Sequence, residues 1–117
     1  MNGSVIQDLP DGDSIDTVLD ALGDRTRRTI LRRLGEGPQA VVDLARGLPV
    51  SRPAVSQHLK VLKEAGLVVD RPAGNRRMYA VDPGGLLELR RFLEDLWADA
   101  LSRFALFAEG GSPRSQA

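Results

Sequence analysis

A short polar row in the middle of the chain has residue types that bind nucleic acid. Within "SRPAVSQHLKVLKEAGLV", residues 51–68, Arg52, Ser56 and Lys60 recur every four residues, and Gln57 follows Ser56. A spacing of four places side chains on one face of a helix. Arginine can bond guanine O6 and N7 or a phosphate, and glutamine can pair with adenine. Serine can bond a phosphate or a base edge, and lysine can bond phosphate oxygens. The row therefore predicts contacts to a DNA duplex.

Position along this segment separates base contacts from backbone contacts. Arg52 stands at the start, the end of a recognition helix that enters the major groove. Lys60 lies two turns further on, which favours a phosphate contact. For His58, two interpretations stay open: a DNA contact, or a half-buried side chain bonded within the fold. The candidate DNA contacts of this segment are Arg52, Pro53, Ser56, Gln57, His58 and Lys60.

The same segment has the signals of a capped helix. Ser51 is a good N-cap, and Pro53 falls in the first turn, where its missing N–H removes no helix bond. Val55, Leu59 and Leu62 form one apolar stripe, and Gly66 can supply the left-handed stop. A short helix over residues 40–48 and the tight link Pro49–Val50 precede it, which predicts a helix-turn-helix.

A basic hairpin is expected directly after this unit. The stretch "LVVDRPAGNRRMYAV" alternates apolar and polar residues around Gly74–Asn75, a pair that suits a type II′ turn. We expect Asn75 to shape the turn and the flanking arginines to contact the DNA backbone. The candidate wing and backbone contacts are Arg71, Asn75, Arg76, Arg77 and Arg28.

Charge is strongly segregated although the net charge is zero. Residues 1–24 hold six acids and no base, residues 25–77 hold twelve bases and four acids, and residues 78–117 hold four bases and six acids. A basic centre between acidic ends favours a polyanionic partner. In the second expected helix, 25–34, we expect Arg25 to Arg28 to approach phosphate. Arg32 and Arg33 would face solvent or pair with the acidic N-terminal segment.

The two end helices carry more apolar surface than one small domain needs. A first helix fits residues 15–22, capped by Asp13 or Ser14, and a last helix of about 23 residues, roughly 34 Å long, starts after the cap Asp82. We expect both helices to pair with a second copy across a two-fold axis. The candidate interface residues are Ile15, Val18, Leu19, Leu22, Leu89, Leu93, Leu96, Trp97, Ala100 and Phe104.

The expected architecture is one mainly α domain with a small β-hairpin, a winged helix-turn-helix. We expect a flexible acidic tail over residues 1–13, the DNA-binding and dimerisation domain over 14–108, and a second flexible tail over 109–117. With no cysteine and no long apolar run, the chain has no thiol chemistry and no membrane span, and a cytoplasmic location is the default. No catalytic set of Ser, His and acid and no glycine-rich phosphate loop is present, so we expect no enzyme and no cofactor.

Four stretches together resemble the ArsR (ArsR/SmtB) family of transcriptional regulators. They are "LGDRTRRTILRRL", "VVDLARGLPVSRPAVSQHLKVLKEAGLV", "RPAGNRRMYAV" and the closing amphipathic helix, and they span about residues 15–108. The most specific match is to the family's run S-x-H-L-x-x-L-x-x-x-G-L, carried here by Ser56, His58, Leu59, Leu62, Gly66 and Leu67. The resemblance implies a dimeric winged-helix repressor that binds an inverted repeat in a promoter.

The chain departs from the metal-sensing members of that family. Their motif CVCDL reads "AVVDL" here, so Ala40 and Val42 stand where metal-binding thiolates would be. The last helix has carboxylates but no histidine, and His58 is the only imidazole, a poor basis for a transition-metal site. We expect no metal site. The input that releases DNA stays open between a small apolar or anionic effector, a protein partner and protein concentration.

One alternative function is a winged helix that regulates a protein partner without sequence-specific DNA binding. Its basic wing would then contact that partner. The two functions differ in their salt dependence, because each phosphate contact to a duplex releases counterions.

Overall fold

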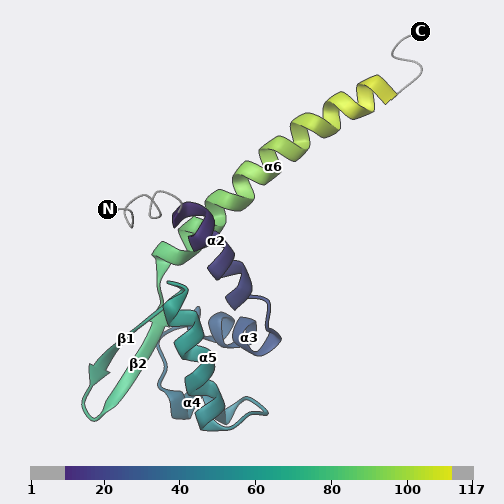
Figure 1. The fold of residues 1–117 in the computed structure, drawn as a ribbon. Coiled ribbons are helices and arrows are strands. Elements are labelled where there is room, and N and C mark those ends of the chain that lie inside the picture. The colour runs from purple at the N-terminus through teal and green to yellow at the C-terminus, as the bar shows by residue number, and fades with distance from the viewer. Residues whose placement is uncertain (1–9, 112–117) are drawn as a thin grey trace.

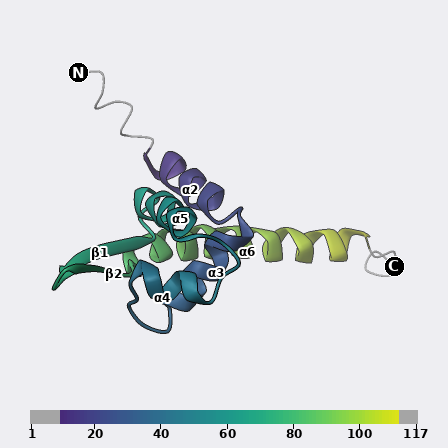
Figure 2. The same ribbon diagram turned by 90° about the horizontal axis from the view of Figure 1, so that it is seen from below.

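The computed structural model describes residues 10–111, and for residues 10–14 and 111 it describes the backbone alone. The expected tail segments 1–9 and 112–117 lie outside this range. The elements follow the chain in a simple order (Figures 1 and 2): α2 Pro10–Ala21, α3 Arg25–Leu34, α4 Val41–Arg46, α5 Arg52–Glu64, β1 Val68–Ala73, β2 Arg76–Val81 and α6 Pro83–Gly111.

The two end helices are longer than the sequence signals predict. Helix α2 begins at Pro10, because proline is well tolerated in a first turn, so Asp13 and Ser14, expected to precede the helix, lie inside it. Helix α6 continues to Gly111, so the tail expected from residue 109 begins as helix. Helix α4, by contrast, stops at Arg46 instead of residue 48.

Side-chain caps start three of the helices, and those of Ser51 and Asp82 confirm the sequence predictions. The carboxylate of Asp24 accepts a hydrogen bond from the amide of Arg27 at 3.0 Å and starts α3. The Ser51 hydroxyl accepts from the amide of Ala54 at 3.3 Å and starts α5. Asp82 accepts from the amide of Gly84 at 2.9 Å and starts α6. These bonds satisfy amides that have no partner inside their helices.

The hairpin has the expected two-residue loop. Ala73 pairs with Arg76, and Gly74 has φ +68°, while no described residue other than glycine has positive φ. This is the pattern of a Gly-first II′ turn. A second connection has no sequence signal. The amide of Gln39 donates to the carbonyl of Tyr79 at 3.0 Å, and Tyr79 returns the bond at 2.8 Å. The loop before α4 is therefore tied to β2.

The core lies where α2, α3, α4, α5 and the start of β1 meet. Its largest fully buried side chains are Ile30, Leu44, Leu59, Leu62, Leu67, Val18, Val55 and Val68. Val18 is therefore a core residue of the protomer with 0% exposure. It has no surface left for a second copy, so the expectation that it lies at a dimer interface is wrong. Ile15, Leu22 and Leu89 are partly buried against the same core. The helical period that predicts an apolar face does not say which molecule covers it.

Helix α6 leaves the domain at one end and the hairpin projects from the body on another side (Figures 1 and 2). With 29 residues, α6 is roughly 43 Å long. Only its beginning contacts the rest of the protomer, chiefly α2. The remainder stands in solvent, and its apolar side chains have no cover within the described chain.

Candidate nucleic-acid interface

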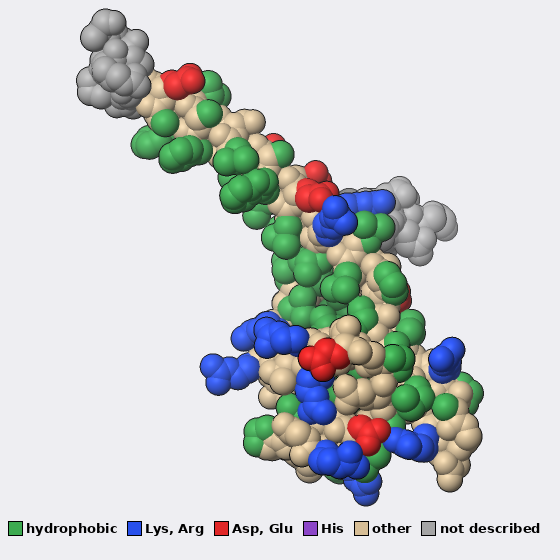
Figure 3. All heavy atoms as spheres, turned by 180° about the vertical axis from the view of Figure 1, so that it is seen from behind, with side chains coloured by type: hydrophobic (Ala, Val, Ile, Leu, Met, Phe, Trp, Pro, Cys, Tyr) green, Lys and Arg blue, Asp and Glu red, His purple; other side chains and the backbone are tan. Residues whose placement is uncertain are grey.

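Helix α5 presents the predicted polar row to solvent. The inner face of the helix consists of Val55, Leu59 and Leu62, each with an exposed fraction of 1% or less. Arg52, Pro53, Ser56, Gln57 and Lys60 are all exposed on the rest of it. The apolar stripe therefore sets the rotation of the helix, and that rotation turns the polar row outward. Figure 3, which shows the molecule from behind, has further Lys and Arg side chains around its lower part.

His58 is half-buried and bonded within the fold. Its Nδ1 lies 3.4 Å from a terminal nitrogen of Arg27 on α3. The Nε of Arg27 also donates to the carbonyl of Ala21 at 2.7 Å, at the end of α2. Arg27, which we expected near phosphate, thus joins three helices. Since a guanidinium only donates, Nδ1 is the acceptor, and Nε2 carries the proton of the neutral ring.

Two of the three wing arginines, Arg76 and Arg77, are paired with carboxylates. Arg76 donates to Asp43 of α4 at 2.7 Å, and Arg77 donates to Asp70 of β1 at 2.7 Å. Asp70 also accepts from Lys63 of α5 at 2.8 Å, and its side chain is only 8% exposed. The hydrogen bonds from Lys63 and then Arg77 hold the pKa of Asp70 below its ordinary value. These pairs fix the wing against α4 and α5.

Two further arginines serve the fold. Arg28 donates to the carbonyl of Leu22 at 2.8 Å, although its exposed guanidinium has other donors left for DNA. Arg33 donates to the carbonyls of Leu44 at 3.0 Å and Asp43 at 3.2 Å. The expectation that Arg33 faces solvent or pairs with the acidic N-terminal segment is wrong. These two carbonyls lie in the last turn of α4, where carbonyls have no intrahelical partner four residues on. By bonding them, Arg33 holds α3 against α4.

Sequence reasoning missed Asp43 and Asp70 as partners of the wing. Asp43 lies 33 residues before Arg76, and no local pattern connects them. Asp70 faces Tyr79 across the hairpin, and Arg77 lies two positions before Tyr79 on β2. A two-stranded register read from the turn would place this pair as diagonal neighbours. The signal for Asp70 was therefore present, whereas that for Asp43 was not.

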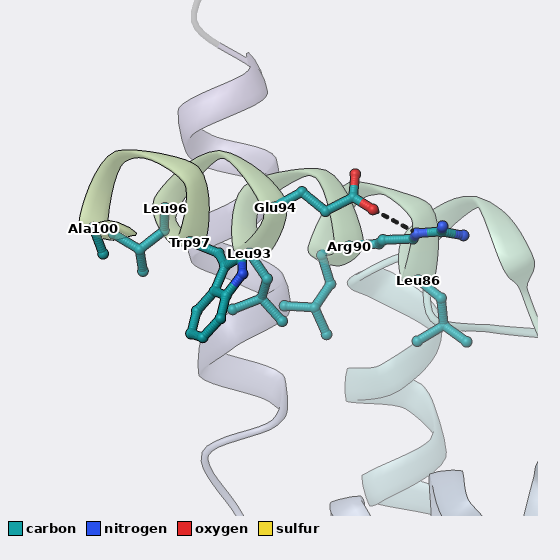
Figure 4. A pocket seen from close by; sticks show the side chains of 8 residues that line it. Leu86, Arg90, Leu93, Glu94, Leu96, Trp97 and Ala100 are labelled. Carbon is teal, nitrogen blue, oxygen red and sulfur yellow. Dashed lines mark hydrogen bonds and ion pairs between the residues drawn. The ribbon is translucent and has the colours of Figure 1, made fainter. Parts of the chain in front are cut away.

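A long apolar groove runs along α6. Its volume is about 710 Å³, and Figure 4 shows Leu86, Leu93, Leu96 and Trp97 pointing to the same side of the helix. Leu93 is 50% exposed and Trp97 66% exposed. The pair Arg90–Glu94, 2.9 Å apart, lies along one edge. Figure 3 shows the apolar band continuing along the helix. Such a continuous apolar surface is typical of an interface.

The stretch that carries metal-binding cysteines in other proteins has aliphatic side chains. Ala40 is buried at 4% exposure and Val42 lies beside it on α4. Among residues 10–111 no three His, Cys, Asp or Glu side chains gather into a group fit for a metal ion. Within that range no helix is long and apolar enough to cross a membrane.

Known proteins match this chain over its helix-turn-helix and beyond. Residues 22–71 match a family model described as a helix-turn-helix domain. The HTH-type transcriptional regulator Rv2034 of Mycobacterium tuberculosis is 61% identical over 92 residues, which cover 79% of this chain and 86% of that protein. The arsenical resistance operon repressor of Escherichia coli is 35% identical, over 65% of this chain and 66% of that protein. The chain belongs to the ArsR/SmtB family of transcriptional regulators.

Solved ArsR-family structures share the fold. An ArsR-like transcriptional regulator from Rhodococcus sp. RHA1 is 35% identical with a TM-score of 0.72, over 82% of this chain and 91% of that one. A homodimeric winged helix-turn-helix DNA-binding domain from Mycobacterium bovis is 27% identical with a TM-score of 0.61, over 78% of this chain and 84% of that one. The predicted winged helix-turn-helix is confirmed.

Family membership makes this chain a DNA-binding transcriptional regulator. The relatives are named regulators or repressors, and none of the names given above is that of an enzyme. These comparisons give no support to the alternative of a winged helix that acts only on a protein partner.

Proposed function

We propose that this ArsR-family regulator binds an inverted repeat in a promoter as a homodimer and represses transcription by occupying it. The observation that carries the proposal is the combination, on one chain, of an outward polar row on α5 and an uncovered apolar face on α6. The first suits a base sequence, and the second suits another copy of the same helix.

The dimer is supported by the apolar face of α6 and the adjoining part of α2. Leu19 is 39% exposed, and the groove between Leu86 and Ala100 is almost entirely apolar. A two-fold contact of this face with its own copy would bury those side chains, as isologous interfaces do. The interface residues we propose are Ile15, Leu19, Leu22, Leu89, Leu93, Leu96, Trp97, Ala100 and Phe104. The homodimeric Mycobacterium bovis domain supports this arrangement.

The two α5 helices of such a dimer would enter successive major grooves. Half-sites one helical turn apart, or a multiple of it, are centred about 34 Å apart or at multiples of that distance. Arg52 would read a guanine, and Ser56 and Gln57 would follow along the groove. Lys60 would bond phosphate. His58 would offer its Nε2–H to the same surface from its seat against Arg27.

The wing would flank that groove. Arg71 is exposed, and Arg76 and Arg77 keep unused donors beside their carboxylate partners. These three arginines would contact the sugar-phosphate backbone, with Asn75 completing the turn, and Arg28 would add a backbone contact from α3. Phosphate contacts fix the position of the protein without reading sequence.

Occupancy of a promoter by the dimer would block polymerase, and we place this activity in the cytoplasm. The protein would act by binding, without catalysis and without a cofactor or metal. Release would need an input that changes the spacing of the two α5 helices or separates the protomers.

The test is selection of genomic fragments by the purified full-length protein, followed by sequencing, with sedimentation of the same sample. We expect a dimer at micromolar concentration and enrichment of fragments that share a palindrome with half-sites one turn apart. A matched variant, Trp97→Glu, should sediment as a monomer and enrich no palindrome. Enrichment of single half-sites by a monomeric wild type would overturn the homodimer, and absence of any enriched sequence would overturn the operator.

A further inference from the structure

A second groove lies between α4, the start of α5 and β2, and the proposed DNA contacts use only its rim. Its volume is about 380 Å³, near the lower end of the range for small-molecule sites. Arg52, Arg76 and Arg77 provide the charged part of its lining. No acidic side chain is among the residues that line it.

The rest of the lining is apolar or aromatic. Ala40, Val41 and Val42 come from the edge of α4, and Tyr79 comes from β2. Tyr79 is held in place by its paired backbone bonds to Gln39, at 3.0 and 2.8 Å. The floor is therefore fixed by the protein backbone. A phosphate of DNA would bond the arginines but would leave this floor uncovered.

The three guanidiniums are not equally occupied. Arg76 and Arg77 each give one bond to a carboxylate outside the groove, Asp43 and Asp70. Arg52 pairs with no other described group. A carboxylate ligand would thus meet one unpaired guanidinium with a planar pair of donors, the arrangement that arginine offers to carboxylates.

We propose that this groove binds a small arene carboxylate, with its carboxylate on Arg52 and its ring over Val42 and Tyr79. The positive lining excludes cations, and the apolar floor favours a ring over a bare inorganic anion. Because Arg52, Arg76 and Arg77 are the same side chains that we assign to DNA, the bound ligand would exclude DNA. This second part rests on the proposed function, whereas ligand binding itself does not.

The chain offers a direct test because it has one tyrosine and one tryptophan. Tyr79 lies in this groove, and Trp97 lies in the larger groove on α6. The full-length protein labelled with 3-fluorotyrosine and 5-fluorotryptophan would give one ¹⁹F resonance for each site. Titration with 1-naphthoate should shift the Tyr79 resonance in a saturable manner and leave the Trp97 resonance in place. A shift of Trp97 alone would overturn the site.

Matched probes and variants separate shape from charge. The neutral 1-naphthylmethanol and the small acetate ion should each bind at least about tenfold more weakly than 1-naphthoate, because each lacks one of the two contacts. Arg52→Gln should weaken 1-naphthoate by about tenfold, the effect of losing a charge-assisted bond. Equal binding of the alcohol and the acid would overturn the role of Arg52.

Val42→Phe fills the floor without replacing a residue that we assign to DNA. Val42 is not among the residues packed against the core, so the variant should fold. It should lose 1-naphthoate binding and keep operator binding. In wild type, 1-naphthoate should raise the apparent Kd for operator DNA, and in Val42→Phe it should not. Ligand binding without this competition would overturn the exclusion of DNA. Failure of operator binding alone, with the Tyr79 shift intact, would contradict the proposed function and leave the ligand site standing.

Discussion

The guanidinium of Arg27 lies 3.4 Å from Nδ1 of His58 and so joins the end of α2 to α5. The same guanidinium donates to the carbonyls of Ala21 at 2.7 Å and Asp20 at 3.4 Å. Helix α2 adjoins the proposed dimer interface, and α5 holds the proposed base contacts. Arg27 is therefore a positioning residue that connects the two.

Replacing this residue tests the connection. Arg27→Ala should lower operator affinity by about threefold to tenfold, since about 1 kcal/mol is a typical loss for one hydrogen bond. The ring ¹⁵N chemical shifts of His58 should indicate a single tautomer in the wild type and a mixture of the two tautomers in the variant. Arg32→Ala, an exposed arginine on the same helix, is the control and should change neither quantity. A fixed His58 tautomer in Arg27→Ala would contradict the role we assign.

Arg52 should read sequence. Arg52→Ala should cost about 1–3 kcal/mol on the operator and relax the preference at one base pair, as loss of a bidentate base contact does. The measurement is a set of Kd values for the operator and its single-base variants. Arg71→Ala is the comparison, since a backbone contact should weaken all sequences alike and lower the salt slope by about one. Equal losses on operator and random DNA for Arg52→Ala would refute its reading role.

Asp43 should restrain DNA binding. Its carboxylate holds Arg76 at 2.7 Å and also pairs with Arg46 at 3.2 Å. Asp43→Asn removes a negative charge from the DNA-facing surface and frees Arg76 for phosphate, so affinity should rise on operator and random DNA alike. Glu36→Gln makes the same charge change at an exposed turn and should have a smaller effect. A fall in affinity for Asp43→Asn would show that the pair serves mainly to position the wing.

Asp70 should make stability depend on acid. Hydrogen bonds from Lys63 and then Arg77 lower the pKa of Asp70 in the folded state. The charged carboxylate therefore stabilises the fold at pH values above 3.8, the ordinary pKa of the group. That contribution is lost as pH falls from this value through the lowered pKa. Urea unfolding should show Asp70→Asn less stable than wild type at pH 7, and the difference should shrink at pH 3. A difference that is constant with pH would exclude the charge as its cause.

The start of α6 leaves no space for a side chain at Gly85. A Cβ there would overlap the carbonyl oxygen of Gly66, a residue that lies just after α5. Gly85→Ala should therefore destabilise the protein by at least about 1–3 kcal/mol, as overpacking does, measured by thermal unfolding. Gly110→Ala is the control, because a Cβ there meets nothing within 4 Å and alanine favours helix. An unchanged melting temperature for Gly85→Ala would contradict this close approach.

Sequence patterns located the elements because their determinants are local. The cap bonds of Asp24, Ser51 and Asp82 and the left-handed Gly66 follow from residues within a few positions, and the stripe of Val55, Leu59 and Leu62 fixes the rotation of α5. The exposed polar row was predictable for the same reason. The start of α2 was not, because nothing local forbids helix between Pro10 and Ser14.

The partners of the arginines could not be read in the same way. The bonds from Arg76 to Asp43, from Arg33 to Leu44 and from Arg27 to His58 span 33, 11 and 31 positions and depend on how the helices pack. A charge count predicts a basic surface but does not tell which guanidiniums are already bonded. The interior place of Val18 was missed on similar grounds, since an apolar face has one pattern whatever covers it.

In the proposed dimer, the uncovered outer half of α6 would make assembly and local folding a single event. Phe104 is 66% exposed and Phe107 74% exposed, and an isolated helical stretch this short is marginal in water. A lone subunit would therefore fray there and offer its aromatic side chains to proteases, whereas a paired one would be protected. At low copy number the concentration of dimer follows the square of the monomer concentration. Promoter occupancy would therefore rise more steeply than the amount of protein in the cell.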